Sequence, residues 1–322
     1  MNICILGAGA FGLCLGIIAN ENKHNVTIWT KFEEEKDYII NNRKSPALPN
    51  IDIDKNINIT TDFKKAIINS ELVIIAIPAS TIRNVITEYK EYIKDKHICI
   101  ASKGIEQDTC LFISKVIKEI INTNKLCVIS GPTFAIDVAN KVPIGLSIAS
   151  ENTETINITE NVLANKHVKL RETKDIIGVE LCGSIKNVMA IIAGILDGLG
   201  LPISTQAMFI TEATNDIKHL IEKLGGDSKT ITSFAGFGDI LLTCTSPKSR
   251  NFTFGKMLGL KKDKKEIENY IKNTTIEGLY TLDSIHKLIT SKNIKMPIIN
   301  LIFDIIYHDT PVEQILPFLI EK

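Results

Sequence analysis

The sequence predicts an α/β protein, with a doubly wound parallel sheet in its N-terminal part and an all-helical domain after it. Up to about residue 175, short apolar runs alternate with amphipathic stretches, and a glycine turn follows the first run. Beyond that point no strand-like run follows and the pattern becomes helical. We therefore expect a sheet domain over residues 1–175 and a helical domain over residues 176–322.

The first apolar run, Asn2 to Leu6, leads into Gly-Ala-Gly-Ala-Phe-Gly at residues 7–12 and then into an apolar helix. A strand, a tight turn and a helix start in this order are typical of Rossmann-type dinucleotide sites. Gly7 allows the sharp turn, Gly9 lets a pyrophosphate approach the backbone, and Gly12 lets the helix lie close to the strand. The free amides at the helix start favour an anion. The alternative is a glycine turn that binds no ligand.

The second predicted strand, residues 25–29, bears on the choice between NAD and NADP. In such βαβ units an acidic residue at its end holds the ribose hydroxyls of NAD, whereas a basic residue suits the extra phosphate of NADP. Here the strand is followed by Thr30 and Lys31, and the acidic residues Glu33 to Glu35 come slightly later, where they also fit a solvated helix start. Lys31 slightly favours NADP, but the sequence leaves the preference open.

Further apolar runs predict strands over residues 72–77, 97–101, 126–130, 145–149 and 168–171, and the intervening and later pattern predicts helices over 62–69, 81–93, 111–122, 176–196 and 207–224. The run 72–77 contains no polar residue and stops at Pro78, as expected for a parallel strand buried on both faces. Ligands of open α/β sheets bind at the carboxyl ends of the strands. Lys103 and Thr133 follow two such ends, so we expect them on the same edge as the glycine turn, although a lysine in a loop is more commonly only a surface charge.

The helix predicted over residues 176–196 is apolar on nearly all sides, yet Lys186 lies in its middle. Burying a lysine is unfavourable unless the amine has partners or loses its proton. We therefore interpret Lys186 as a functional group, the alternative being a side chain that extends to the surface. Asp239, Arg250 and Asn251 are further polar candidates in this apolar domain, although helix capping and an ordinary surface arginine explain them equally well.

The bulk composition favours a soluble globular protein without nucleic acid, membrane or metal. Basic and acidic residues both number 37, so no overall field attracts nucleic acid. The longest wholly apolar run, residues 188–196, is shorter than the roughly 20 residues that span a bilayer. The seven cysteines and six histidines are scattered, which indicates reduced thiols and no metal site. Because a required strand begins directly after Met1, we expect no signal peptide and a cytoplasmic protein.

Seven motifs occur in one order along the chain: residues 7–12, Ser102-Lys103-Gly104, Ser130 to Ala135, Gly183 to Asn187, Gly238-Asp239, Ser249-Arg250-Asn251 and Glu277-Gly278. Together they resemble the bacterial NAD(P)-dependent glycerol-3-phosphate dehydrogenase family, from Met1 to about the last 20 residues. The resemblance implies reversible NAD(P)H-dependent reduction of dihydroxyacetone phosphate to sn-glycerol 3-phosphate, which supplies glycerophospholipid biosynthesis. It also suggests a homodimer.

The resemblance further implies roles for single residues. Lys186 matches the family's proton donor and acceptor. Substrate contacts are implied for Lys103, Gly131, Thr133, Lys186, Asp239, Ser249, Arg250 and Asn251. Besides the three glycines of the turn, cofactor contacts are implied for Ala10, Phe11, Lys31, Lys103, Ala135, Arg250, Thr275 and Glu277. The position of Lys31 varies in character within the family, so the resemblance does not decide between NADH and NADPH.

The proposed chemistry can also be argued from the residues. Hydride delivery to a ketone leaves an alkoxide that needs a proton, and a positioned lysine can supply it. We hypothesise that Asp239 orients Lys186, that Arg250 and Asn251 bind a phosphate, and that Lys103 stabilises the developing charge. A related two-domain reductase of a 2-oxo or 3-hydroxy acid would not need the phosphate-binding pair. A non-catalytic NAD(P) sensor would have no use for a buried lysine.

Overall fold

The computed structural model describes residues 1–321, and its chain divides into two compact units. The sheet unit comprises residues 1–103 and 113–176, and the helical unit comprises residues 104–112 and the chain from residue 177 onward. Residues 104–112 thus leave the sheet unit and join the helical unit, which the sequence pattern did not indicate. The last residue of the expected helical domain, Lys322, lies outside the described residues.

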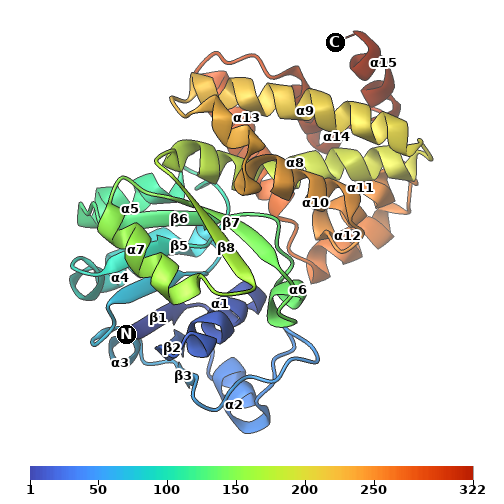
Figure 1. Cartoon of the computed structure of the whole chain (residues 1–322). Coiled ribbons are helices and arrows are strands. Elements are labelled where there is room, and N and C mark those ends of the chain that lie inside the picture. Colours follow the sequence, from blue (N-terminus) through green and yellow to red (C-terminus); the bar gives the residue numbers. More distant parts are fainter. Residues whose placement is uncertain (322) are drawn as a thin grey trace. The chain divides into compact units, whose positions relative to one another are not determined.

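The sheet unit is built on one eight-stranded sheet with the order β3-β2-β1-β4-β5-β6-β7-β8 (Figure 1). Its strands are β1 (Asn2–Leu6), β2 (Asn25–Trp29), β3 (Asn58–Thr60), β4 (Leu72–Ile75), β5 (His97–Ile100), β6 (Leu126–Ser130), β7 (Ile144–Ala149) and β8 (Val168–Thr173). All neighbouring strands are parallel except β6 and β7. The strand order reverses between β1 and β4, which confirms the predicted doubly wound sheet.

Helices cover both faces of this sheet. They are α1 (Ala10–Glu21), α2 (Glu33–Asn42), α3 (Phe63–Ile67), α4 (Ala79–Ile93), α5 (Ile113–Ile121), α6 (Ala135–Ala139) and α7 (Thr153–Leu163). Helix α1 packs with α6 and α7, and α4 packs with α3 and α5. Successive side chains of a strand point to opposite faces, and all four residues of β4 are fully buried. Neither face of the central sheet is therefore open to water, as the unbroken apolar run of β4 predicts.

The helical unit contains α8 (Ile176–Gly198), α9 (Ile203–Lys223), α10 (Asp239–Thr245), α11 (Arg250–Gly259), α12 (Lys264–Asn273), α13 (Glu277–Ser291), α14 (Pro297–Tyr307) and α15 (Ile315–Glu321), with the short turns η1 (Ser228–Thr232), η2 (Phe234–Gly238) and η3 (Val312–Gln314). Every residue of α8 from Gly178 to Leu196 is buried, and the core of the unit forms around them. By length and composition α8 could cross a membrane, but 89% of its apolar window is buried inside the protein. We therefore interpret α8 as the core helix of this unit.

All seven cysteines are free thiols, and all but Cys110 are buried. Burial raises the pKa of Cys4 and of Cys14 to about 12, so both remain protonated at neutral pH. The Sγ atom of Cys14 donates a hydrogen bond to the carbonyl oxygen of Ala135 at 2.9 Å. These thiols therefore act as small apolar core residues rather than as nucleophiles.

Candidate active site

The glycine turn of the sheet unit has the geometry of an anion-binding site. Gly7 has a φ of +115°, and a Cβ atom at Gly12 would lie 2.1 Å from the Gly7 carbonyl oxygen, so α1 lies directly against the turn. Gly9 is the N-cap of α1 and no side chain caps the helix. A Cβ atom at Gly9 would meet no other atom within 4 Å, so the backbone faces open space there. The first amides of α1 are thus available to an anion at this point.

Other predicted residues of the sheet unit lie at or after the carboxyl ends of its strands. Gly131 and Thr133 follow β6, and the Thr133 hydroxyl donates to the Gly131 carbonyl oxygen at 3.3 Å. A Cβ atom at Gly131 would lie 2.5 Å from the Gly145 carbonyl oxygen, so only glycine fits between β6 and β7. Lys103 follows β5 by three residues. Because β5 and β6 run parallel, these segments leave the sheet at one edge.

The segment after β2 shows where the acidic residues Glu33 to Glu35 lie. Lys31 is exposed, while Thr30 is buried and its hydroxyl donates to the Glu35 carboxylate. Glu33 to Glu35 form the first turn of α2, where negative charges are favoured by the helix dipole. The acidic run is therefore a helix start, one of the two interpretations that the sequence allowed.

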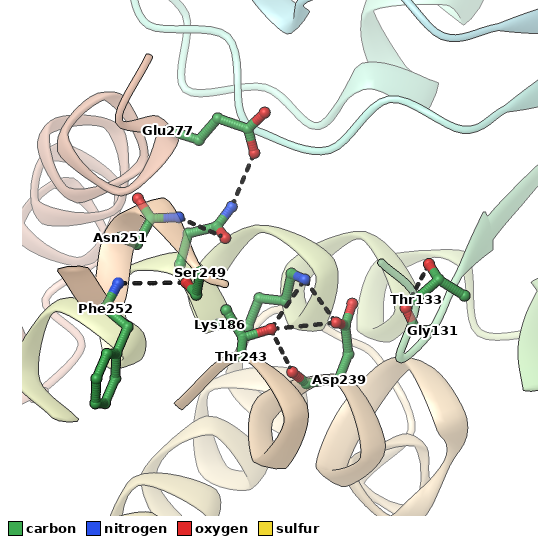
Figure 2. A network of polar contacts seen from close by, with 10 residues as sticks. Gly131, Thr133, Lys186, Asp239, Thr243, Ser249, Asn251, Phe252 and Glu277 are labelled. Carbon is green, nitrogen blue, oxygen red and sulfur yellow. Dashed lines mark hydrogen bonds and ion pairs between the residues drawn. The ribbon is translucent and has the colours of Figure 1, made fainter. Parts of the chain in front are cut away.

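In the helical unit, Lys186 is buried in the middle of α8 with only 8% of its surface exposed. Its Nζ atom donates to Asp239 Oδ1 at 2.5 Å and to Thr243 Oγ1 at 3.1 Å (Figure 2). Asp239 is fully buried, and Thr243 is nearly so. The amine therefore has two buried polar partners, and the alternative of a lysine that extends to the surface is wrong.

Asp239 and Thr243 reach Lys186 because both belong to the first turn and a half of α10. Asp239 is the first residue of that helix, and Thr243 follows it by four positions, so the two side chains lie on one face. The Thr243 hydroxyl also contacts the Asp239 carbonyl oxygen at 2.6 Å. The preceding turn η2 packs Gly236 so tightly that a Cβ atom would lie 2.3 Å from the Ile231 carbonyl oxygen. Sequence reasoning missed Thr243, although its spacing from Asp239 was visible.

The Cys244 thiol lies next to Lys186 and Asp239 but does not compete for the proton that these two groups share. Burial raises the pKa of Cys244 to about 12; the neighbouring Lys186 ammonium lowers it and the Asp239 carboxylate raises it again. The thiol is therefore neutral at pH 7. Among the described residues, no group of three or more histidine, cysteine or carboxylate side chains could hold a metal ion.

A second polar network begins at the residue after the lysine. Asn187 Nδ2 donates to Glu277 Oε2 at 3.1 Å, and Asn187 Oδ1 accepts from Asn251 Nδ2 at 3.0 Å (Figure 2). The amide of Gly278 donates to Asn251 Oδ1 at 2.8 Å. Residues from α8, α11 and α13 thus meet in one network. Asn187 belongs to a sequence motif, but its role could not be predicted from it because its partners are distant in sequence.

The side chains around this network differ in their contacts within the protein and in their exposure. Ser249 caps α11, its Oγ accepting from the Phe252 amide at 3.3 Å, so capping accounts for its presence. Arg250 begins the helix with its side chain 54% exposed, and its Nη2 lies 4.0 Å from Glu277 Oε1. Thr275 is exposed in the segment before α13. A half-exposed guanidinium beside the first amides of a helix can bind an anionic oxygen cluster such as a phosphate.

Replacing Asp239 with asparagine is expected to lower the free energy of unfolding by about 3–5 kcal/mol, because it leaves the Lys186 charge buried without its counter-charge. Asp283→Asn is the matched control, since its partner Lys287 is 56% exposed and the pair contributes less than about 1 kcal/mol. Urea denaturation of both variants measures the difference. Equal losses for the two substitutions would show that the buried Lys186–Asp239 pair contributes no more to stability than the exposed pair.

Family models of the NAD-dependent glycerol-3-phosphate dehydrogenase N-terminus and C-terminus match residues 2–156 and 175–317. A glycerol-3-phosphate dehydrogenase (NAD(P)+) of a Thermoanaerobacter species is 36% identical, the match covering 95% of this chain and 93% of that protein. The protein of the same name from Staphylococcus haemolyticus is 32% identical over 97% and 95%. The crystal structure of glycerol-3-phosphate dehydrogenase from Coxiella burnetii superposes with a TM-score of 0.93 at 32% identity, covering 99% and 98%.

More distant structures share the fold alone. D-mandelate dehydrogenase with NADH gives a TM-score of 0.58 at 15% identity, and a putative 2-dehydropantoate 2-reductase of Enterococcus faecalis gives 0.54 at 14%. The rival two-domain reductases are therefore much less similar than the relatives above. With both family models matched and relatives above 30% identity along nearly its whole length, the chain belongs to the NAD-dependent glycerol-3-phosphate dehydrogenase family.

Proposed function

We propose that this chain is an NAD(P)-dependent oxidoreductase that converts dihydroxyacetone phosphate reversibly into sn-glycerol 3-phosphate. The observation that carries the proposal is the buried Lys186, whose amine has Asp239 and Thr243 as partners in the core of the helical unit. Burying an ionisable amine is energetically unfavourable, and a role in proton transfer explains why Lys186 is buried. The names of the relatives supply the substrate class.

The geometry at Lys186 supports a role for its amine in an acid-base step. When bound, NAD(P)H supplies a hydride to the carbonyl carbon of the substrate, which leaves an alkoxide on the oxygen. The Lys186 Nζ atom holds the proton that this oxygen takes up, and in the reverse direction the neutral amine removes it. Asp239 and Thr243 fix the direction of the amine by accepting two of its hydrogen bonds.

We propose that the phosphate of the substrate binds at the start of α11. The Arg250 guanidinium presents several donors, and Asn251 and Ser249 lie beside the first amides of the helix. The further substrate contacts that we propose are Lys103, Gly131 and Thr133 of the sheet unit. We propose that residues 1–175 form the cofactor domain and that residues 176–322 form the substrate domain.

The glycine turn fits a dinucleotide because the backbone at Gly9 faces open space and no side chain caps α1. We propose that Gly7, Gly9 and Gly12 hold the pyrophosphate, and that the remaining cofactor contacts are Ala10, Phe11, Lys31, Lys103, Ala135, Arg250, Thr275 and Glu277. Exposed Lys31 favours the extra phosphate of NADP, since the nearby Glu35 is engaged by Thr30. We further propose a homodimer that works in the cytoplasm and supplies glycerophospholipid biosynthesis.

The alanine variant of Gly9 is expected to bind NADPH at least about tenfold more weakly, because the added methyl group occupies the space that the pyrophosphate needs. Its melting temperature is expected to stay unchanged, since the methyl group meets no protein atom within 4 Å. Gly12→Ala is the contrasting variant, because its Cβ must displace the Gly7 carbonyl and lower stability. Fluorescence titration and thermal melting separate the two effects. Unchanged NADPH affinity in Gly9→Ala would refute the assignment.

The proposed reaction is tested by following the oxidation of NADH and NADPH with dihydroxyacetone phosphate, dihydroxyacetone and a panel of 2-oxo acids, and the reduction of NAD+ and NADP+ with a panel of 3-hydroxy acids. We expect kcat/KM for the phosphorylated ketone to exceed that for dihydroxyacetone by at least about 10³-fold, since several charge-assisted hydrogen bonds depend on the phosphate. Preferential turnover of an acid would instead identify a related reductase. Cofactor binding without turnover of any substrate would identify a sensor.

A further inference from the structure

Helices α8 and α11 touch through their backbones rather than through side chains. A Cβ atom at Gly255 of α11 would lie 1.9 Å from the Ile191 carbonyl oxygen of α8, and one at Gly194 of α8 would lie 2.0 Å from the Phe252 carbonyl oxygen of α11. No side chain fits at either position without displacing the other helix. Helix axes usually lie 8–10 Å apart, at a distance that their contact side chains set, and here two glycines remove those side chains.

The contact extends along one face of α8. One turn beyond Ile191, a Cβ atom at Gly259 would lie 2.3 Å from the Ile195 carbonyl oxygen. One turn before it, a Cβ atom at Gly278, the second residue of α13, would lie 2.8 Å from the Asn187 carbonyl oxygen. Three successive turns of α8 therefore each meet a glycine of a neighbouring helix. The positions of α11 and of the start of α13 are fixed against the backbone of α8.

This backbone contact lies next to the two groups that the proposed reaction needs. Lys186 belongs to the turn of α8 that Gly278 touches, and Arg250 and Asn251 begin α11 one turn before Gly255. Asn251 is tied to the same place by its hydrogen bonds to Asn187 Oδ1 and from the Gly278 amide. The distance between the amine and the start of α11 thus depends on the glycine contact.

We propose that Gly255, supported by Gly259, is a positioning residue that sets the spacing between Lys186 and the phosphate-binding start of α11, and so selects a three-carbon phosphoester. The inference rests on the proposed function, in which Lys186 serves the carbonyl oxygen and Arg250 the phosphate. Because one small, short molecule must reach both groups at once, a displacement of α11 by an ångström or less disrupts the reactive geometry. The glycine acts through these residues and touches no substrate itself.

The test compares a substrate that needs both ends of the site with a probe that needs only one. In Gly255→Ala, we expect kcat/KM for dihydroxyacetone phosphate to fall about 30-fold, in the range that small misplacements cause. Inorganic phosphate, used as a competitive inhibitor, occupies only the start of α11, so its inhibition constant is expected to change less than about threefold. A general loss of structure would instead weaken phosphate and substrate together.

Gly225→Ala is the matched stability control. Gly225 has a φ of +88°, and a Cβ atom there would meet nothing within 4 Å, so the substitution strains the backbone after α9 without moving α11. We expect a lower melting temperature with unchanged kinetics. If Gly255→Ala does not fold, Gly259→Ala replaces it, with a drop in kcat/KM of about tenfold and the same retained phosphate inhibition, because Gly259 lies one turn further from Asn251.

Two outcomes overturn the inference. If phosphate inhibits the wild type but the folded glycine variants keep wild-type kcat/KM, or lose phosphate and substrate affinity by equal factors, the spacing role fails while the proposed function stands. If phosphate does not inhibit the wild type at all, the start of α11 is not the phosphate site, and the inference fails together with that part of the proposed function.

Discussion

Replacing Lys186 with alanine is expected to lower kcat for dihydroxyacetone phosphate by about 10³-fold, because the alkoxide then lacks its proton donor. The NADPH dissociation constant is expected to stay within about twofold of the wild type, since the glycine turn of the sheet unit is unaffected. Steady-state absorbance and fluorescence titration provide the two measurements. The loss corresponds to about 4 kcal/mol of transition-state stabilisation.

Two controls separate the loss of proton transfer from a loss of structure. Removing a buried charge also leaves Asp239 without its partner, so the melting temperature and the circular dichroism of the variant must be compared with the wild type. Lys186→Met, which retains the length and apolar stem of the side chain, separates packing from proton transfer. A folded variant that keeps more than about a tenth of wild-type kcat, an effect of only ~1.4 kcal/mol, would make the acid-base role untenable.

The Arg250→Ala variant is expected to raise KM for dihydroxyacetone phosphate by about 10²-fold or more, with a smaller change in kcat. Two hydrogen bonds between a guanidinium and phosphate oxygens contribute about 1.5–3 kcal/mol each, and both are lost. Arg250→Lys should recover only part of the affinity, because an ammonium cannot offer the paired donors. The half-exposed side chain makes a loss of stability small.

Lys248→Ala is the control for Arg250, since it removes one positive charge from an exposed position two residues earlier. It is expected to change KM less than about threefold, as bulk electrostatics alone would. The two variants are also compared with unphosphorylated dihydroxyacetone, whose turnover should fall much less in Arg250→Ala, because only the proposed cofactor contact of Arg250 is then lost. Equal effects of Arg250→Ala on both ketones would refute the phosphate assignment.

Sequence periodicity predicted the sheet unit well because its signals are local. Strand β6 spans residues 126–130 as expected, and the glycine turn joins β1 to α1. Boundaries shifted where backbone hydrogen bonding, not hydropathy, decides them: β4 ends at Ile75, although the apolar run continues to Ile77. The apolar pattern did not predict that β7 runs antiparallel to β6, since the direction of a strand depends on the connection that leads to it rather than on its own residues.

That residues 104–112 belong to the helical unit could not be predicted from the sequence, for a different reason. Ile105 and Phe112 are buried in the core of the helical unit, and the Gly104 amide donates to Ser184 Oγ at 3.1 Å. These contacts join residues about 80 positions apart. A segment this short carries no period that could reveal its partner, so only the tertiary structure assigns it.

The candidate site shows the same division between local and distant information. Lys186 was conspicuous because a charge in an apolar helix violates the expected pattern. Its pairing with Asp239 was hypothesised from residue types, and the structure shows the contact at 2.5 Å. Thr243, the role of Asn187 and the backbone contact of Gly255 emerged only from the packing of helices that are distant in sequence.

Single-turnover stopped-flow kinetics with NADPH already bound tests the central claim most directly, because product release and cofactor binding no longer contribute to the observed rate. When dihydroxyacetone phosphate is mixed with the wild type, one equivalent of NADPH is expected to be oxidised in a fast phase. The Lys186→Met variant is expected to bind NADPH normally and to oxidise it at least about 10²-fold more slowly. Hydride transfer in this variant within a factor of ten of the wild-type rate would contradict the account.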